Sequence, residues 1–243
     1  GENDFFVMNQ ATVEEFNLQQ SVIPIISRSE QLKGVQLTNE DYNNLIELGK
    51  KVFFFAPGNE RFDALTDEQK AYIQWGFNKN YKCRIRPRWY HVSQTWCADA
   101  FLIRQAHLYP RMILNEKKAL VTDTLHKVRF LEGIDGKQVT AAFLNTYTFA
   151  LSETLGRSYG GGVLTFEPGE IRKIRIPMHM ADQLDLQKID TWQRQGEIDK
   201  VLEYTDSILL RKGLSLTEHE IKLLHSIWKK MCDRRMSRKN QKK

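Results

Sequence analysis

The pattern of apolar and polar positions along the chain changes between helical and strand spacing. Two capping motifs, Thr38-x-x-Asp41 and Thr66-x-x-Gln69, precede apolar residues at helical spacing and predict a helix after each. Residues 82–92 alternate as a strand does, and Pro87 within them indicates an edge strand or a bulge. Short apolar runs predict further strands at 51–56, 100–105, 111–115, 119–122 and 126–131.

Turn signals become frequent after these strands. Asp135-Gly136 predicts a hairpin turn, and residues 139–155 have the spacing of a helix. Three glycines, Gly160 to Gly162, allow a tight bend or a close approach of two backbones. A strand-like run follows them at 163–166.

Beyond Pro177 the strand signals stop, and two helices are predicted at 181–211 and 217–236. The predicted fold class is therefore α+β: a twisted, mostly antiparallel sheet with flanking helices, followed by a C-terminal helical segment. We place a domain boundary near residue 178, which gives one domain at 1–177 and a helical segment with a basic tail at 178–243.

Composition excludes several classes of protein. With 243 residues, of which 41% are hydrophobic, the chain can bury a sizeable core. No apolar run approaches the roughly 20 residues that span a bilayer, and no secretory signal is visible. Cys83, Cys97 and Cys232 are odd in number and widely spaced, which fits a reducing cytoplasm and gives no metal-site pattern. We expect a cytoplasmic globular protein without membrane contact.

The net charge of +6 conceals a division into blocks. Residues 1–69 carry a net charge of −7, residues 70–131 of +9, residues 132–210 of −4 and residues 211–243 of +8. Segregated basic blocks suit a phosphate backbone, which contributes salt-dependent affinity that does not depend on sequence. The alternative is a solvated surface whose charge happens to be uneven.

The first basic block contains three alternating arginines, Arg84, Arg86 and Arg88, and no acidic residue occurs from Lys70 to Ala98. On a strand, this spacing places the three guanidinium groups on one face. Arginine reads guanine through two hydrogen bonds in the major groove and also binds phosphate. Alternatively, the arginines pair with acids elsewhere in the chain, and the neighbouring aromatic side chains belong to the core. Three neighbours join this candidate DNA-binding set: Lys82, Trp89 and Tyr90.

Further candidate DNA contacts lie at turns or on an exposed strand face. Asn115 ends the strand at 111–115, and Lys117 and Lys118 after it would place cations near a phosphate. In the strand at 126–131, Lys127 and Arg129 lie on the face opposite that of His126. The N–H groups of the glycine run could approach a phosphate closely. The structural alternatives are an Asn-rich turn and a tight glycine turn. The residues concerned are Asn115, Lys117, Lys118, Lys127, Arg129, Tyr159, Gly160 and Gly161.

Two other functions stay open at this point. Asp135-Gly136-Lys137 matches the Asp-x-Lys half of a metal-dependent nuclease pattern, with Asp123 as a second carboxylate upstream. Asp123 and His126 also hint at a catalytic pair, but no nucleophile accompanies them, and a set of structural hydrogen bonds is the alternative. A protein-interaction module would use 181–236 as a helical docking surface.

Five segments of the chain resemble motifs of one family of DNA-modifying enzymes. In their order and number they are similar to the target recognition domain of N6-adenine DNA methyltransferases of the type I and TaqI-like class. The resemblance implies a domain that sits C-terminal to a catalytic domain and selects the DNA sequence to be methylated. The segments are GENDFFVMN (1–9), KCRIRPRWYHV (82–92), YPRMILNEKKALVTDTLHKVRF (109–130), NTYTFALSETLGRSYGGG (145–162) and RSYGGGVLTFEPGEIRKIRIP (157–177).

The catalytic machinery of that family is not visible in this chain. An adenine methyltransferase needs the tetrapeptide Asn-Pro-Pro-Tyr or a close variant, whereas no two of the six prolines here are adjacent. The Gly-rich turn for S-adenosylmethionine is not found either. The resemblance therefore implies no activity of this chain alone, with the methyl donor bound by a catalytic domain in the same chain or a partner chain. It also implies double-stranded DNA as a partner, within a restriction-modification system.

Overall fold

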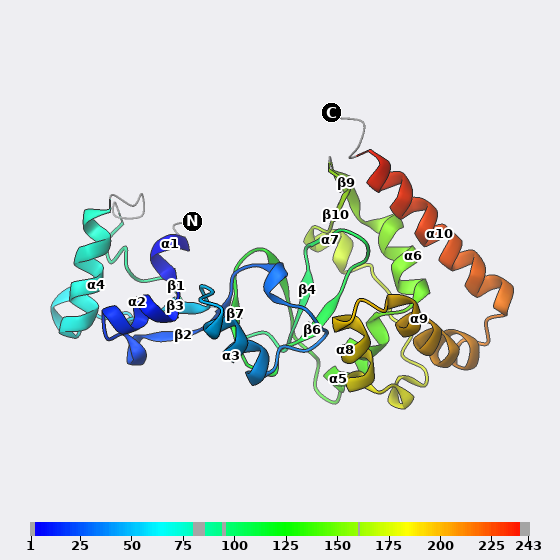
Figure 1. Ribbon diagram of the computed structural model, residues 1–243, viewed down its shortest axis with the longest axis horizontal. Coiled ribbons are helices and arrows are strands. Elements are labelled where there is room, and N and C mark those ends of the chain that lie inside the picture. Colours follow the sequence, from blue (N-terminus) through cyan, green and yellow to red (C-terminus); the bar gives the residue numbers. More distant parts are fainter. Residues whose placement is uncertain (1–2, 80–85, 94–95, 160, 239–243) are drawn as a thin grey trace. The chain divides into compact units, whose positions relative to one another are not determined.

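The computed structural model describes residues 3–79, 86–93, 96–159 and 161–238 (Figure 1). They form two compact units. The first unit comprises residues 1–31, 38–98 and 116–122, and the second comprises residues 32–37, 99–115 and 123–243. The chain therefore passes repeatedly between the two units before the second is completed.

A four-stranded sheet with the order β1-β3-β2-β7 forms the base of the first unit. The β1–β3 and β2–β3 pairs are antiparallel, and β2 runs parallel to β7. The strands are β1 (Val7–Met8), β2 (Val22–Ile26), β3 (Phe53–Phe55) and β7 (Leu120–Val121). The α-helices of its described residues are α1 (Asn3–Phe6), α2 (Gln10–Glu15), α3 (Asn39–Glu47) and α4 (Asp67–Asn78).

An aromatic core centred on Phe5 holds the first unit together. The Phe5 ring is stacked on that of Tyr72 at a centroid distance of 4.9 Å and lies 4.7 Å from that of Trp89. The Tyr72 hydroxyl donates a hydrogen bond of 2.6 Å to the Phe5 carbonyl, which satisfies two buried polar atoms. A Cβ at Gly76 would lie 2.3 Å from the Phe5 ring, so α4 approaches this closely because it has no side chain there.

Two small antiparallel sheets belong to the second unit, with the orders β6-β4-β8 and β5-β10-β9. Their strands are β4 (Ala100–Ile103), β5 (Gln105–Ala106), β6 (Met112–Leu114), β8 (Leu125–Val128), β9 (Arg157–Tyr159) and β10 (Val163–Thr165). The predicted α+β class with mostly antiparallel pairing is confirmed, and the strands are distributed over three small sheets.

The second unit also contains most of the helical residues, and the long helix α10 runs beside α6 (Figure 1). Trp228 of α10 packs against Phe149 of α6, with ring centroids 5.1 Å apart. A π-helical turn at Ser207–Gly213 follows α9 directly. The helices are α5 (Gly136–Phe143), α6 (Thr146–Leu155), α7 (Pro168–Ile171), α8 (Leu186–Arg194), α9 (Ile198–Asp206) and α10 (Glu218–Ser237).

A buried ion pair fixes α10 to α6. The Arg235 guanidinium donates to the Glu153 carboxylate at 2.6 Å, and both side chains are almost fully buried. Arg235 also donates to the carbonyl of Gly162, in the turn between β9 and β10. Removing one partner of such a pair strands a buried charge and costs about 3–5 kcal/mol. The domain boundary predicted near residue 178 falls between α6 and α10, which share one hydrophobic core, and this boundary stays a prediction.

Three local predictions are wrong, and at Asp135 and Asn145 a polar side chain caps a helix where other structure was expected. Asp135 does not begin a hairpin: its carboxylate accepts from the N–H of Lys137 at 2.8 Å and so begins α5. The single helix predicted at 139–155 is divided, since α5 ends at Phe143 and the Asn145 side chain caps α6. The helix predicted at 181–211 is likewise divided into α8, α9 and the π-helical turn.

Asp206 at the end of α9 makes the stability of the second unit depend on pH. Its carboxylate accepts from the Thr146 N–H at 2.9 Å and from the Thr146 hydroxyl at 2.5 Å. Burial raises the pKa of Asp206 from 3.8 to about 6, and the two hydrogen bonds oppose this. At pH values between the unfolded and the folded pKa, the folded protein binds a proton that the unfolded chain does not. The stability that Asp206 contributes is therefore present below about pH 4 and is lost as the pH rises through about 6.

Substituting Asp206→Asn should remove this pH dependence, because the amide does not titrate and keeps the size of the side chain. The free energy of unfolding of the natural protein minus that of the variant should fall by on the order of 2 kcal/mol between pH 4 and pH 6. Urea unfolding at several pH values, followed by circular dichroism, measures both proteins. A difference that stays constant over this range would contradict the assignment.

Candidate nucleic-acid interface

The described part of the predicted recognition strand, residues 86–92, is a turn followed by irregular backbone. Arg88 has a φ of 48°, a left-handed conformation that interrupts strand alternation. The strand prediction is therefore wrong over these residues. Arg86 and Arg88 are both exposed, whereas Lys82 and Arg84 lie outside the described residues.

Side chains of this turn are anchored to the loop at 58–60. The Arg88 guanidinium donates through Nη1 to the carbonyl of Asn59 at 2.8 Å and to its side-chain oxygen at 3.0 Å. The Tyr90 hydroxyl donates to the Glu60 carbonyl at 3.2 Å, and His91 Nδ1 lies 2.7 Å from the Gly58 carbonyl. Three hydrogen-bonding side chains thus hold the turn on a second segment about 30 residues away in sequence.

Trp89 and Tyr90, predicted as DNA contacts, lie in the aromatic core of the first unit. Only 7% of Trp89 and 4% of Tyr90 is exposed. The Tyr90 ring lies 6.2 Å from that of Phe62, and burial raises the pKa of the Tyr90 hydroxyl above its ordinary value. A contact of either ring with a base stays a prediction, and it would require the ring to leave this core.

The residues predicted around position 115 are divided between the two units. Asn115 belongs to the second unit and is buried. Lys117 and Lys118 belong to the first unit. The Lys117 ammonium donates to the Asn39 side chain at 3.1 Å and lies over the Tyr42 ring at 4.7 Å. Lys118 is exposed with a φ of 57°, so the two lysines face solvent more than Asn115 does.

The strand β8 places its polar residues alternately, as predicted. His126 and Lys127 are consecutive and so point to opposite faces of the sheet. His126 Nε2 lies 2.8 Å from the Phe166 carbonyl, and the Thr122 hydroxyl donates to a backbone carbonyl at 3.0 Å. These contacts favour structural roles for His126 and Thr122. Lys127 is half-buried and Arg129 is exposed.

Gly161 and Gly162 of the glycine run lie in the turn between β9 and β10. Gly161 and Gly162 have φ values of 89° and 75°, which favour glycine, and Gly160 lies outside the described residues. A Cβ at Gly162 would lie 3.0 Å from the Met236 sulfur, so this position also requires close packing against α10. Tyr159 on β9 is half exposed. Phosphate binding by these N–H groups stays a prediction.

The described residues contain no group of three or more His, Cys, Asp and Glu side chains that could hold a metal ion. Asp135, the first carboxylate of the nuclease pattern, is engaged as the cap of α5. The helices formed by the described residues include none that is long and apolar enough to cross a membrane.

One group of residues was missed by sequence reasoning. Phe62 begins an exposed 3₁₀ turn, Phe62–Ala64, and Arg61 precedes it. Both line a surface hollow with Asp63, Arg88 and Tyr90. The signal available in the sequence was an Arg-Phe pair between polar turns, and it was weak, because its proximity to residues 88–90 depends on the fold.

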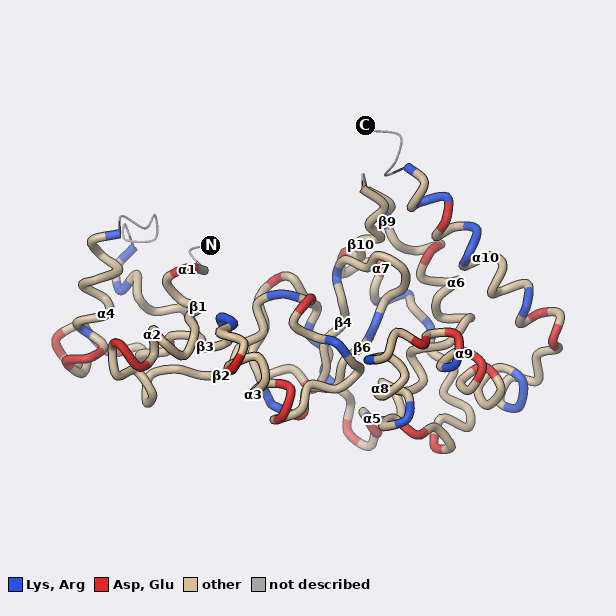
Figure 2. The backbone as a smooth tube through the Cα atoms, viewed as in Figure 1, with Lys and Arg blue, Asp and Glu red and all other residues tan. Residues whose placement is uncertain are grey.

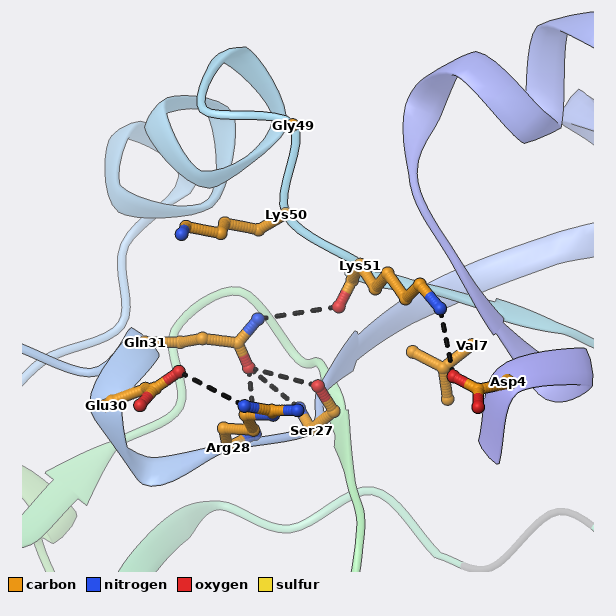
Figure 3. Close-up of a pocket in the computed structure, with 9 residues that line it drawn as sticks. All are labelled: Asp4, Val7, Ser27, Arg28, Glu30, Gln31, Gly49, Lys50 and Lys51. Carbon is orange, nitrogen blue, oxygen red and sulfur yellow. Dashed lines mark hydrogen bonds and ion pairs between the residues drawn. The ribbon is translucent and has the colours of Figure 1, made fainter. Parts of the chain in front are cut away.

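A second hollow of the first unit is also lined by cations, but they do not converge (Figure 3). Lys50 and Lys51 extend in opposite directions in this view. Lys51 pairs with Asp4 at 3.0 Å, and Arg28 lies 3.7 Å from Glu30. Because two of the three cations already face acids, this hollow gives no anion site.

Part of the last basic block lies on α10, where Figure 2 shows basic residues at intervals along the helix, and its residues 239–243 lie outside the described residues. Arg235 is buried, whereas Lys230, Arg234 and Arg238 are exposed. Arginines in the last turn also complement the negative end of the helix dipole. Part of this block therefore serves the fold, and its exposed members are the candidates for phosphate contact.

The fold and sequence are similar to those of restriction-modification enzymes. The structure resembles that of the type IIG restriction endonuclease BpuSI, with a TM-score of 0.57 over 98% of this chain and 29% of that chain. The sequence identity to BpuSI is 12%, so this likeness concerns the fold alone. The type II methyltransferase M.AccI of Acinetobacter calcoaceticus is 26% identical over 223 residues, which cover 88% of this chain and 39% of M.AccI.

Residues 1–210 match the family described as the C-terminal domain of type II methyltransferase M.Eco57I. The chain belongs to this family. It spans about two fifths of M.AccI and under a third of BpuSI. The resemblance to a methyltransferase domain that was drawn from the sequence is confirmed.

Substituting Trp89→Ala should destabilise the first unit, because it removes a ring from the aromatic core. The expected loss is about 3–5 kcal/mol in the free energy of unfolding. The matched variant Trp96→Ala removes a ring that is 42% exposed and should cost less than about 1 kcal/mol. Urea unfolding provides both values. A stable Trp89→Ala protein that has lost DNA binding would instead assign this ring to base contact.

Proposed function

We propose that this chain is the DNA target recognition domain of a site-specific adenine-N6 DNA methyltransferase of a restriction-modification system. The observation that carries the proposal is the family match over residues 1–210, to a domain placed C-terminally in a type II methyltransferase. Methyl transfer and S-adenosylmethionine binding are assigned to a catalytic domain. The recognition domain would hold double-stranded DNA and contact base edges and phosphates.

The described cations support a DNA-binding role. Arg86 and Arg88 are exposed on a turn that is anchored to the loop at 58–60 by hydrogen bonds from the side chains of Arg88 and Tyr90. Pre-organised side chains lose less conformational entropy on binding than mobile ones do. Further exposed or half-exposed cations lie in both units: Lys117, Lys118, Lys127 and Arg129.

Protein docking is a second candidate function that a specific observation favours. Leu223 and Ile227 of α10 are exposed and lie four residues apart, on one face of the helix. An apolar pair on a polar helix is typical of a contact with another protein surface. Binding to a catalytic domain with little response to salt would support this role.

The isolated chain should bind duplex DNA with an affinity that falls as salt rises, because phosphate contacts release counterions. With several such contacts, an increase from about 50 to 200 mM salt should weaken binding by about a hundredfold or more. Fluorescence anisotropy of a labelled duplex measures this dependence. A salt response near zero, or no binding at low salt, would contradict the proposed function.

Base reading and phosphate binding can be separated by two matched arginine variants of the full-length enzyme. Arg86→Ala should change which sites are methylated, since loss of a base contact costs about 1–3 kcal/mol at one base pair. Arg234→Ala on the exposed face of α10 should weaken all sites about equally, because phosphate contacts carry no sequence information. Methylome sequencing compares them. An unchanged motif and efficiency with Arg86→Ala would exclude this turn from recognition.

A further inference from the structure

The hollow lined by Arg61, Phe62, Asp63, Arg88 and Tyr90 combines groups from two segments of the first unit. We refer to it as the Phe62 hollow. Phe62 is 39% exposed although it is a large aromatic residue. Its ring rests on Tyr90, with centroids 6.2 Å apart, and Tyr90 is buried in turn. The exposed ring therefore has a fixed support beneath it.

The walls of the Phe62 hollow are held in place by hydrogen bonds. Arg88 is tied to Asn59 by two bonds from one terminal nitrogen, and Tyr90 is tied to the Glu60 carbonyl. Arg88 also keeps a left-handed backbone, with a φ of 48°, which costs energy for a residue with a Cβ. Such strained positions cluster at binding sites, where they fix the direction of a side chain.

The chemistry of the hollow matches a nucleobase. Its aromatic ring offers a stacking surface, and every base has a face that can stack. The two guanidinium groups, of Arg61 and Arg88, carry the charge that attracts the flanking phosphates. Asp63 offers the acceptor that an exocyclic amino group of adenine or cytosine requires.

We infer that Phe62 stacks on a nucleobase that has left its pair in the bound duplex, while Arg61 and Arg88 contact the neighbouring phosphates. The inference rests on the proposed function, since it adds a contact to the same DNA-binding role. A phosphate alone would not require the exposed ring. An apolar protein surface would not require two cations beside it.

The test uses this chain with two labelled duplexes of one sequence, one fully paired and one with a single bulged 2-aminopurine. The natural chain should bind the bulged duplex about tenfold more tightly, because the base is already unpaired and can stack at once. Phe62→Leu should abolish the preference and the fluorescence quenching of the 2-aminopurine. Phe62→Trp should retain both. Phe77→Leu, which alters a comparably exposed phenylalanine of the same unit, should leave both unchanged.

The outcomes separate this inference from the proposed function. If the natural chain binds both duplexes with a normal salt response and Phe62→Leu keeps the preference for the bulge, the inference is wrong and the proposed function survives. If the natural chain shows no preference for the bulge, the inference is also wrong. If the natural chain binds neither duplex, both the inference and the proposed function are wrong. Urea unfolding of Phe62→Leu confirms that it is folded, and the quenching by Phe62→Trp tests the ring independently.

Discussion

The second unit depends on how the buried carboxylate of Asp190 holds a segment from the N-terminal half of the chain. Asp190 Oδ1 accepts from the backbone N–H groups of Val35 and Gln36 at 2.7 and 3.1 Å. Its other oxygen accepts from Arg194 at 2.5 Å. Gly34 has to be a glycine in this arrangement, because a Cβ would lie 2.0 Å from the carboxylate. A carboxylate fully bonded in this way can be buried, whereas an unpaired one could not.

The same segment is bound from its carbonyl side by Arg111. This guanidinium donates to the carbonyls of Leu32, Lys33 and Gly34 at 2.8 to 3.0 Å, and its burial lowers its pKa. In the segment 32–37, two backbone N–H groups therefore bind the Asp190 carboxylate, and three backbone carbonyls bind the Arg111 guanidinium. Arg111 and the buried Arg235 also show that a charge count overestimates the cations available to DNA, because arginines inside a fold serve the fold.

Sequence reasoning succeeded where a local motif determines the structure. The capping boxes at Thr38 and Thr66 begin α3 and α4, since their hydrogen bonds need only neighbouring residues. It failed at Asp135, where one dipeptide suits both a hairpin turn and a helix cap. It also failed at residues 86–90, whose alternation resembles a strand while Arg88 and Tyr90 bond to a loop about 30 residues away. Such long-range contacts leave no periodic signal in one sequence.

The distribution of aromatic residues explains why the candidate interface could be located only in part. Sequence alone treats Trp89, Tyr90 and Phe62 alike, as aromatic residues near basic ones. Packing distinguishes them: Trp89 joins the core around Phe5, Tyr90 supports the surface from below, and Phe62 stays exposed above it. A rigid aromatic layer beneath an exposed ring restricts the directions in which that ring and its neighbouring arginines can point. The proposed role in selecting among DNA sequences would need this restriction, because a mobile side chain accepts many partners with similar free energies.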